Sequence, residues 1–250
     1  FTTVLDDPTF GPALRHTMIF TFVSIAFQYA AGLALAVFFN RHFRLAGTLR
    51  ALFLIPWLLP LIVSASTWSW MFNSESGVLN YALHLVGVAP VDWLNSPDWA
   101  LTSVIIANIW IGIPFNLVIL YSGLQNIPGE LYEAASLDGA NAWQQFRRIT
   151  FPLAAPGMVA AAIFSFITSF DEFFISQFLS SVNTTTLPVQ VFNVLQYDVD
   201  PTVTAISAVL IAVAVLALAL VGVARRLGSG RASGLLPVES AAALPGNEAP

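Results

Sequence analysis

The sequence has no cysteine and no lysine, and only 9% of its residues are charged. Without cysteine there are no thiol nucleophiles, disulfides or thiolate metal sites. Without lysine the chain lacks the Gly-Lys-Ser/Thr phosphate cradle of a P-loop, so any ATP that drives its work must be hydrolysed by another subunit. Its three histidines are scattered and no HExxH or GxSxG motif occurs, which argues against a membrane enzyme.

Apolar residues, by contrast, are abundant. Hydrophobic residues make up 57% of the chain and its mean hydropathy is +0.76, whereas a soluble domain usually carries about 25% charged residues. Five runs reach the roughly 20 mostly apolar residues that a membrane-spanning helix needs. We therefore predict an all-α membrane protein whose spans cover residues 17–39, 49–72, 100–124, 157–179 and 202–224.

The two ends of the chain lead to further expectations. The chain begins at Phe1 rather than methionine, and we expect a sixth, N-terminal span to precede it in the full-length protein. Residues 227–250 are rich in Gly, Ser, Ala and Pro without apolar periodicity, which predicts a disordered tail. Residues 1–226 are thus expected to form one membrane domain.

Several local features shape the predicted spans. Pro56 and Pro60 lie inside the second run, where proline removes backbone hydrogen bonds and kinks a helix. Gly32 and Ala36 are four residues apart, a small-residue pair that lets another helix approach closely. In the loop that follows the second run, residues 77–86 are expected to form a short amphipathic helix on the surface.

The arginines assign an orientation to these spans. An excess of Lys and Arg marks the cytoplasmic side of a membrane protein. With five spans, only Arg15 falls on one side, and the loops at 73–99 and 180–201 contain no arginine. We therefore place these loops outside the cell and residues 126–156 inside it. The arginines assigned to the cytoplasmic side are Arg41, Arg44, Arg50, Arg147, Arg148, Arg225, Arg226 and Arg231.

Residues 126–156 are the one long polar interruption that combines acids, arginines and helix-forming residues. Pro128, followed by Glu130 and Glu133, fits a helix N-terminus, where the helix dipole favours acids. The small residues that follow leave a helix surface that a partner can approach closely. The first half of this segment is thus predicted to be a short helix with an accessible face.

The second half of the segment turns back towards the membrane. Gly139 permits a sharp turn or a close contact. Residues 141–149 are expected to form a second short helix, which Pro152 and Pro156 end before the fourth span begins. A helix–glycine–helix hairpin parallel to the membrane would transmit a push to the spans at both of its ends.

The hairpin carries a motif with several fixed spacings, made of Glu133-Ala134-Ala135, Gly139, Ile149 and Pro152. This motif resembles the EAA signature of binding-protein-dependent ABC importer permeases. It departs from the family pattern only at Phe151, where leucine is usual, and both residues are apolar. The long spacing makes the resemblance specific, and it argues against a passive channel. The resemblance covers about residues 17–226.

The resemblance implies the transmembrane domain of a type I ABC importer, with this hairpin as its coupling element. By that resemblance, Glu133 would pair with a cation on the ATPase, and Gly139 would lie at the turn inserted into the ATPase cleft. The residues that it implies for coupling are Glu133, Ala134, Ala135, Asp138, Gly139, Ile149 and Pro152.

The partners implied by this resemblance follow from the same assignment. We expect ABC ATPase subunits that bind ATP and Mg²⁺, a second permease subunit of the same or a different sequence, and an extracytoplasmic substrate-binding protein. The chain itself is expected to hold no cofactor, no metal and no nucleic acid. It would lie among lipids as a multi-pass protein of a prokaryotic inner membrane.

Polar residues within the spans are the candidates for a substrate path. Asn108 and Asn116 are eight residues apart and share a helix face, so they either line a path or bond neighbouring helices. Asp171 and Glu172 are adjacent acids near the far end of the fourth predicted span, and they either line the path or tie spans together near the outer interface. Phe170 is a further candidate beside them.

The two halves of the chain resemble different importers. Leu52-Phe53-Leu54-Ile55-Pro56 and Gly77-Val78-Leu79-Asn80 resemble sugar permeases of the maltose and trehalose type. Ser169-Phe170-Asp171-Glu172 and Thr186-Leu187-Pro188-Val189 are more similar to spermidine/putrescine permeases. Because sugar-like features extend over the longer half, we expect sugar uptake, with polyamine uptake as the alternative.

Overall fold

The computed structural model describes residues 8–41, 43–180, 184–197 and 206–216, together with residues 219 and 222. Regular structure within these residues is helical throughout, as the sequence predicts. In chain order the helices are α2 (Phe10–Phe39), α3 (Ala46–Leu58), α4 (Leu61–Met71), α5 (Val78–Leu85), α6 (Ala100–Gln125), α7 (Gly129–Leu137), α8 (Ala142–Gln145), the π-helical turn η1 (Phe146–Thr150), α9 (Phe151–Phe170), α10 (Phe174–Leu179), α11 (Leu187–Tyr197) and a further helix at Ile206–Leu216.

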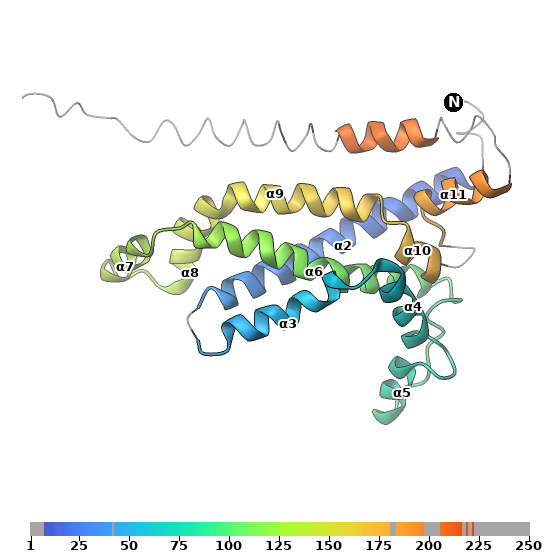
Figure 1. Ribbon diagram of the computed structural model, residues 1–250, viewed down its shortest axis with the longest axis horizontal. Coiled ribbons are helices and arrows are strands. Elements are labelled where there is room, and N and C mark those ends of the chain that lie inside the picture. The colour runs from blue at the N-terminus through green and yellow to red at the C-terminus, as the bar shows by residue number, and fades with distance from the viewer. Residues whose placement is uncertain are drawn as a thin grey trace, which may run out of the picture.

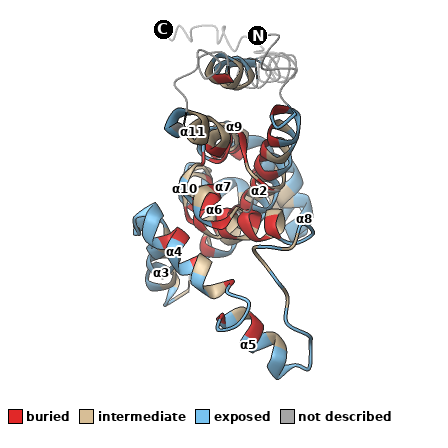
Figure 2. Cartoon of the chain, turned by 90° about the vertical axis from the view of Figure 1, so that its right-hand side faces the viewer, coloured by how far each residue is buried: buried red, intermediate tan, exposed pale blue. Residues whose placement is uncertain are grey.

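Three long helices, α2, α6 and α9, form the centre of the bundle and pack against one another (Figure 1). The most apolar stretch of α6 is 56% buried, against 28% for α2 and 39% for α9. Buried residues gather where these helices face each other, whereas α3 and α5 are largely exposed (Figure 2). Helix α6 is therefore the core helix, and the exposed sides of the others are apolar surface suited to lipid.

Two glycines bring α2 and α6 into close contact. A Cβ atom on Gly32 would lie 2.6 Å from the Cβ of Asn116, and one on Gly112 would lie 2.2 Å from Cδ of Gln28. Real Cβ atoms do not approach other atoms so closely, so no larger residue fits at either position without a shift. The close approach predicted at Gly32 is thus confirmed, and each glycine faces a side-chain amide on the opposite helix.

The second predicted span is not one helix. It breaks into α3 and α4, which are bent by 93° relative to each other. Leu59 is extended with ψ 141° and Pro60 precedes the first turn of α4, because a residue before proline avoids the helical region. The sequence predicted a kink within one helix, whereas the structure has two separate helices. The described residues contain three helices apolar and long enough to cross a membrane, or four if the bent pair is one span.

The fourth predicted span also needs correction, because it begins and ends earlier than residues 157–179. Helix runs without interruption from Ala142 to Phe170 through α8, η1 and α9. Pro152 lies in the first turn of α9 and Pro156 lies inside it, so neither ends the second hairpin helix as predicted. The π-helical turn just before α9 changes the hydrogen-bond spacing, and a first-turn proline has no amide that needs a partner.

The fifth predicted span, 202–224, is described only at Ile206–Leu216 and at two further positions, all of them helical. Ile206 packs with Phe10 and Ala13 of α2 and with Leu187 of α11. The predicted tail at 227–250 and the arginines that follow the fifth span lie outside the described residues.

The helices give the molecule two distinct ends. The turn between α2 and α3 lies at the same end as α7 and α8, whereas α4, α5, α10 and α11 lie at the other end (Figure 1). The arginine distribution had assigned residues 40–50 and 126–156 to the same side of the membrane. The arrangement in space agrees with that assignment.

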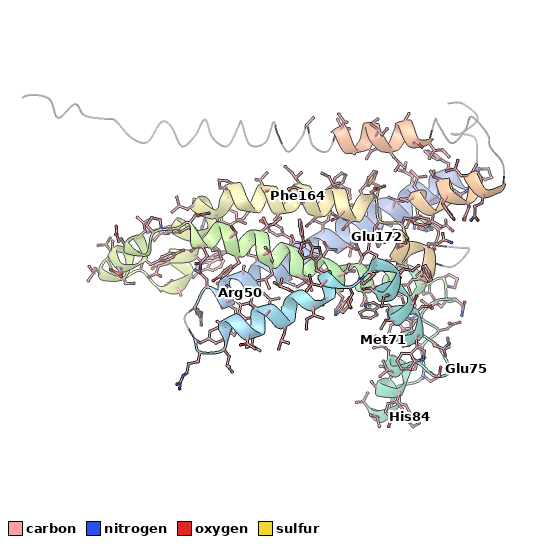
Figure 3. All side chains as sticks on the ribbon, viewed as in Figure 1. Arg50, Met71, Glu75, His84, Phe164 and Glu172 are labelled. Atoms are coloured by element: carbon pink, nitrogen blue, oxygen red, sulfur yellow. The ribbon has the colours of Figure 1, made fainter. Side chains whose placement is uncertain are left out.

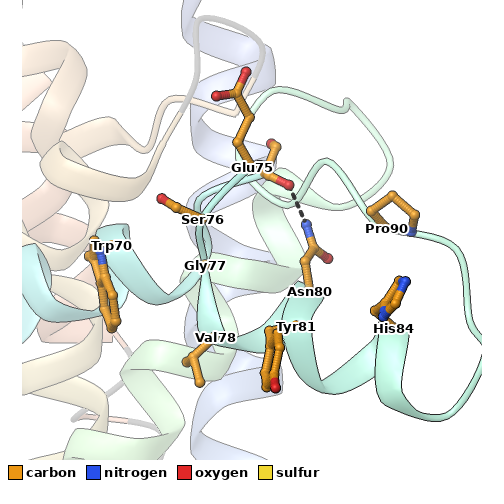
Figure 4. A pocket seen from close by; sticks show the side chains of 10 residues that line it. Trp70, Glu75, Ser76, Gly77, Val78, Asn80, Tyr81, His84 and Pro90 are labelled. Atoms are coloured by element: carbon orange, nitrogen blue, oxygen red, sulfur yellow. Dashed lines mark hydrogen bonds between the residues drawn. The ribbon is translucent and has the colours of Figure 1, made fainter.

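The segment between α4 and α6 projects as an arm from the end opposite α7 and α8, which the arginine distribution predicts to be the outer end, and α5 forms its tip (Figure 1). Asn80, which is 6% exposed, holds the arm together. Its Nδ2 donates to the carbonyls of Ser74 (3.1 Å) and Val91 (2.9 Å), and its Oδ1 accepts from Val91 N (3.0 Å) and Trp93 Nε1 (2.9 Å). Figure 4 shows Asn80 with one of these bonds as a dashed line. One side chain thus joins both sides of the loop. The sequence predicted the surface helix but not this connection.

The bonds of Asn80 lead to a first prediction. Asn80→Leu keeps the side-chain volume but leaves the Val91 amide and the Ser74 carbonyl without partners, which should destabilise the folded arm by about 1–3 kcal/mol. Amide hydrogen exchange at Val91 should accelerate accordingly in the detergent-solubilised protein. Asn95→Leu is the control, because Asn95 is exposed and bonds only to nearby Asp92. Unchanged protection of Val91 in the Asn80 variant would contradict this role.

Candidate functional site

A cavity of about 330 Å³ lies among α2, α6, α9 and the break between α3 and α4. Its polar lining residues form a polar wall and its aromatic lining residues an aromatic wall, and α6 and α9 contribute to both. The polar lining residues are Gln28, Asn108, Asn116, Ser165, Thr168, Ser169 and Glu172, and the aromatic ones are Trp57, Phe115 and Phe164. Such a mixture of apolar surface with a few convergent polar groups is typical of a small-molecule site.

The amides of the polar wall are held by hydrogen bonds between helices. Gln28 Nε2 donates to the carbonyl of Asn108 (2.9 Å), and Asn108 Nδ2 donates to Ser169 Oγ (3.2 Å). Ser165 Oγ donates to Asn116 Oδ1 (2.9 Å), while Asn116 Nδ2 donates to the carbonyl one turn earlier on α6 (3.0 Å). The sequence left open whether Asn108 and Asn116 line a path or bond neighbouring helices. In the structure they do both, since they bond neighbouring helices and line the cavity.

The aromatic wall is a row of rings from three helices. Phe115 of α6 lies between Trp57 of α3 and Phe164 of α9, with ring centroids 5.9 and 5.8 Å apart. Trp57 is 52% exposed and Phe164 is 51% exposed, so both rings have accessible faces. The row is therefore available to a bound molecule.

The two adjacent acids have different environments, and neither lies within the membrane helix as predicted. Helix α9 ends at Phe170, so Asp171 and Glu172 occupy the break before α10. Asp171 is exposed and does not line the cavity. Glu172 is buried and lines it, while its two carboxylate oxygens accept from Ile175 N (2.6 Å) and Ser176 N (2.9 Å). Glu172 thus caps the start of α10 as it borders the cavity.

Phe170, the remaining candidate for the substrate path, is buried and stacks on Phe166 with ring centroids 5.2 Å apart. It does not line the cavity. Of the five predicted path residues, the structure therefore brings Asn108, Asn116 and Glu172 together.

Several lining residues escaped the prediction. Gln28 is the only amide in the first apolar run, and that position could have been found as readily as the two asparagines. Ser165 and Ser169 are four residues apart on α9, a spacing that places them on one face. Trp57 and Phe164 had no distinguishing pattern, because aromatic residues occur throughout these spans.

The predicted hairpin is present, and its turn has a defined geometry. Gly139 follows α7 with φ +75°. Its amide donates to the carbonyl of Ser136 (3.1 Å), and the amide of Ala140 donates to the carbonyl of Ala135 (2.9 Å). This pair of bonds is the Schellman motif, which ends a helix with a left-handed residue that is usually glycine.

The second half of the hairpin is equally ordered by hydrogen bonds. Asn141 and Gln144 form a capping box in which each side chain accepts from the other backbone amide at 2.9 Å. Gln145 Nε2 donates to Ser136 Oγ (3.0 Å), and the hydroxyls of Tyr132 and Thr150 are bonded at 3.0 Å. The two arms of the hairpin are therefore joined to each other, not only through the turn.

The coupling residues implied by the motif fall into an accessible set and a packed set. Glu133, Ala134, Asp138, Gly139 and Pro152 are exposed, while Ala135 and Ile149 are half-buried. Leu137, at the end of α7, is 90% exposed. An apolar side chain so fully exposed at a tip is suited to insertion into a partner protein, and the motif did not single it out.

Comparison with known proteins agrees with these features. The family described as "Binding-protein-dependent transport system inner membrane component" matches residues 28–231. The trehalose/maltose transport system permease protein MalF of Thermococcus litoralis is 40% identical over 170 residues, which cover 68% of this chain and 58% of that protein. The sulfoquinovosyl glycerol transport system permease protein SmoG of Agrobacterium fabrum is 36% identical over 191 residues, covering 75% of this chain and 62% of that protein. The chain thus spans about three fifths of the length of these relatives.

Solved structures share the fold. A chain of a bacterial alginate ABC transporter in complex with an alginate pentasaccharide-bound periplasmic protein superposes with a TM-score of 0.82 at 22% identity, covering 91% of this chain and 82% of that one. A chain of the MetNI methionine ABC transporter superposes with a TM-score of 0.66 at 22% identity, covering 89% and 98%. The chain belongs to the family of inner-membrane components of binding-protein-dependent transport systems and is a multi-pass membrane protein with their all-helical fold.

Proposed function

We propose that the chain is the permease subunit of an ATP-driven importer that takes up a sugar. The observation that carries this proposal is the cavity in which side-chain amides and hydroxyls face a row of aromatic rings. Neutral polyhydroxyl compounds bind through hydrogen bonds to such polar groups, while the apolar faces of their rings pack on aromatic side chains. The trehalose/maltose permease named above supports this choice.

The polyamine alternative fits the cavity less well. A polyamine carries several positive charges, and binding it away from water requires several carboxylates or other compensating groups. Among the described residues, Glu172 is the only carboxylate that lines the cavity, and both of its oxygens already accept backbone amides of α10. The charge of the site therefore favours a neutral substrate.

The hairpin supplies the connection to a separate ATPase in this proposal. ATP and Mg²⁺ would be bound by that subunit, and its closure would move the α7–Gly139–α8 turn. Because helix continues from Ala142 to Phe170, this motion would reach Ser165 and Ser169 in the cavity wall directly. A second permease subunit would complete the path, and an extracytoplasmic binding protein would deliver the substrate to the outer end.

A prediction for the cavity concerns its aromatic wall. Trp57→Ala removes an accessible ring without leaving a buried polar group unpaired, so it should raise the half-saturating sugar concentration about two- to tenfold. The measurement is uptake of radiolabelled maltose or trehalose by the assembled importer in proteoliposomes. Trp70→Ala is the control, because Trp70 is similarly exposed at 60% and lies outside this cavity.

Competition distinguishes the two substrate classes in the same assay. Unlabelled sugars should reduce uptake in the parent protein, whereas spermidine and putrescine should not. Saturable uptake of labelled spermidine, with no uptake of any sugar, would show that the substrate assignment is wrong while leaving the permease assignment intact.

A third prediction concerns the turn of the hairpin. Gly139→Asp places a side chain at φ +75°, where L-residues cost roughly 1–2 kcal/mol, and adds a charge at the tip. We expect it to abolish transport and weaken co-purification of the ATPase while membrane insertion stays normal. Gly87→Asp is a matched control, since Gly87 has φ +76° but lies at the outer end. Full uptake by the Gly139 variant would disprove the coupling role.

A further inference from the structure

A second cavity, of about 500 Å³, lies at the turn between α2 and α3, away from the proposed sugar path. Among the described residues that line it are three guanidinium groups, those of Arg41, Arg44 and Arg50, and no carboxylate. The cavity of the proposed sugar path, by contrast, has no cationic side chain among its described lining residues. Arg41 and Arg44 are exposed and Arg50 is half-buried, so the cluster can attract an anion from the surroundings.

Two contacts with α6 hold the walls of this cavity in place. The guanidinium carbon of Arg50 lies 4.2 Å from the centroid of the Tyr121 ring on α6. Gln125, one turn further along α6, donates from Nε2 to Asn40 Oδ1 at 2.7 Å. These contacts therefore join the α2–α3 turn to the end of α6. They give the cavity a defined shape, which a cluster of unconnected surface side chains would not have.

An apolar wall adjoins the three arginines. The rings of Phe38, Phe39, Phe43 and Phe53 form one cluster with neighbouring centroids 5.2 to 6.2 Å apart. Phe38 is 49% exposed and Phe53 is 42% exposed, and Leu52 beside them is 54% exposed. Cationic groups thus lie next to an exposed hydrocarbon surface, which is the pattern that matches an anionic amphiphile.

The cavity lies at the cytoplasmic end of the bundle. Arg50 lies at the opposite end from Glu75 and His84 of the outer arm (Figure 3). The cytoplasmic leaflet carries the anionic phospholipids that basic clusters next to a membrane helix attract. The charge, the exposed aromatic rings beside it and the position at the end of the helix bundle all agree with one kind of ligand.

We propose that this cavity binds the phosphate of an anionic phospholipid of the cytoplasmic leaflet. The three guanidinium groups contact the phosphate oxygens, and the acyl chains lie along Phe38 and Phe53. A free phosphate ion would leave the aromatic wall unused. A water-soluble ATPase subunit would approach the exposed hairpin tip instead, where Leu137 projects.

The test uses the assembled importer in nanodiscs that contain phosphatidylglycerol and phosphatidylcholine. Native mass spectrometry counts the molecules of each lipid that stay bound after release from the disc. The parent complex should retain phosphatidylglycerol preferentially. In the combined variant Arg41→Gln, Arg44→Gln and Arg50→Gln, this retention should fall at least about tenfold, because each cation contributes to attraction of an anionic headgroup. Arg15→Gln, which removes an exposed arginine at the outer end, should retain the lipid as the parent does.

Two outcomes would overturn the proposal. The first is equal retention of phosphatidylglycerol by the combined variant and the parent; if the combined variant also loses the ATPase subunits, the arginines belong to that interface. The second is displacement of the lipid from the parent by inorganic phosphate at equal concentration, which would identify a site for a free anion. Both can be scored whether or not sugar uptake proves to be the function of the cavity, and the second needs only the parent complex.

Discussion

Polar side chains buried between membrane helices determine how this bundle is arranged. An amide or hydroxyl that finds no partner in a bilayer costs several kcal/mol. Gln28, Asn108 and Asn116 avoid that cost only when α2, α6 and α9 meet in one register, with Ser165 and Ser169 opposite them. The glycines at 32 and 112 make room for this contact. The residues that hold the bundle together are therefore the same residues that line the proposed sugar path.

The continuity of the helix from the hairpin into α9 gives this arrangement a mechanical consequence. Ser165 lies about 21 Å along the helix from Phe151, at a rise of roughly 1.5 Å per residue. The capping box and the bond between Tyr132 and Thr150 brace the hairpin against the start of α9. A displacement of the turn would thus reach the hydrogen bond between Ser165 and Asn116 along one continuous helix, which includes the π-helical turn and Pro156.

The sequence predicted those features that depend on local chemistry. The composition of the apolar runs predicted the helices. The arginine bias predicted which loops share an end of the bundle, and the spacing around Gly139 predicted the glycine turn. Features that depend on contacts between elements were missed or misplaced. The 93° break at Leu59–Pro60 and the early end of α9 at Phe170 depend on how the outer end packs. Glu172 looked like an intramembrane acid, because nothing local shows that the following residues start a new helix for it to cap.

The hairpin and the basic cavity, which lie at the same end of the bundle, are connected through α6. Tyr121 and Gln125, which form one wall of the basic cavity, lie in the last two turns of that helix, and α7 of the hairpin begins at Gly129. A hairpin that moves α9 must move it relative to something fixed, or the entire bundle simply rotates in the membrane. A phospholipid held by Arg41, Arg44 and Arg50 would tie the end of α6 to the plane of the leaflet. The hairpin would then move α9 against an anchored α6, and these are the two helices whose asparagine and serine side chains meet in the cavity.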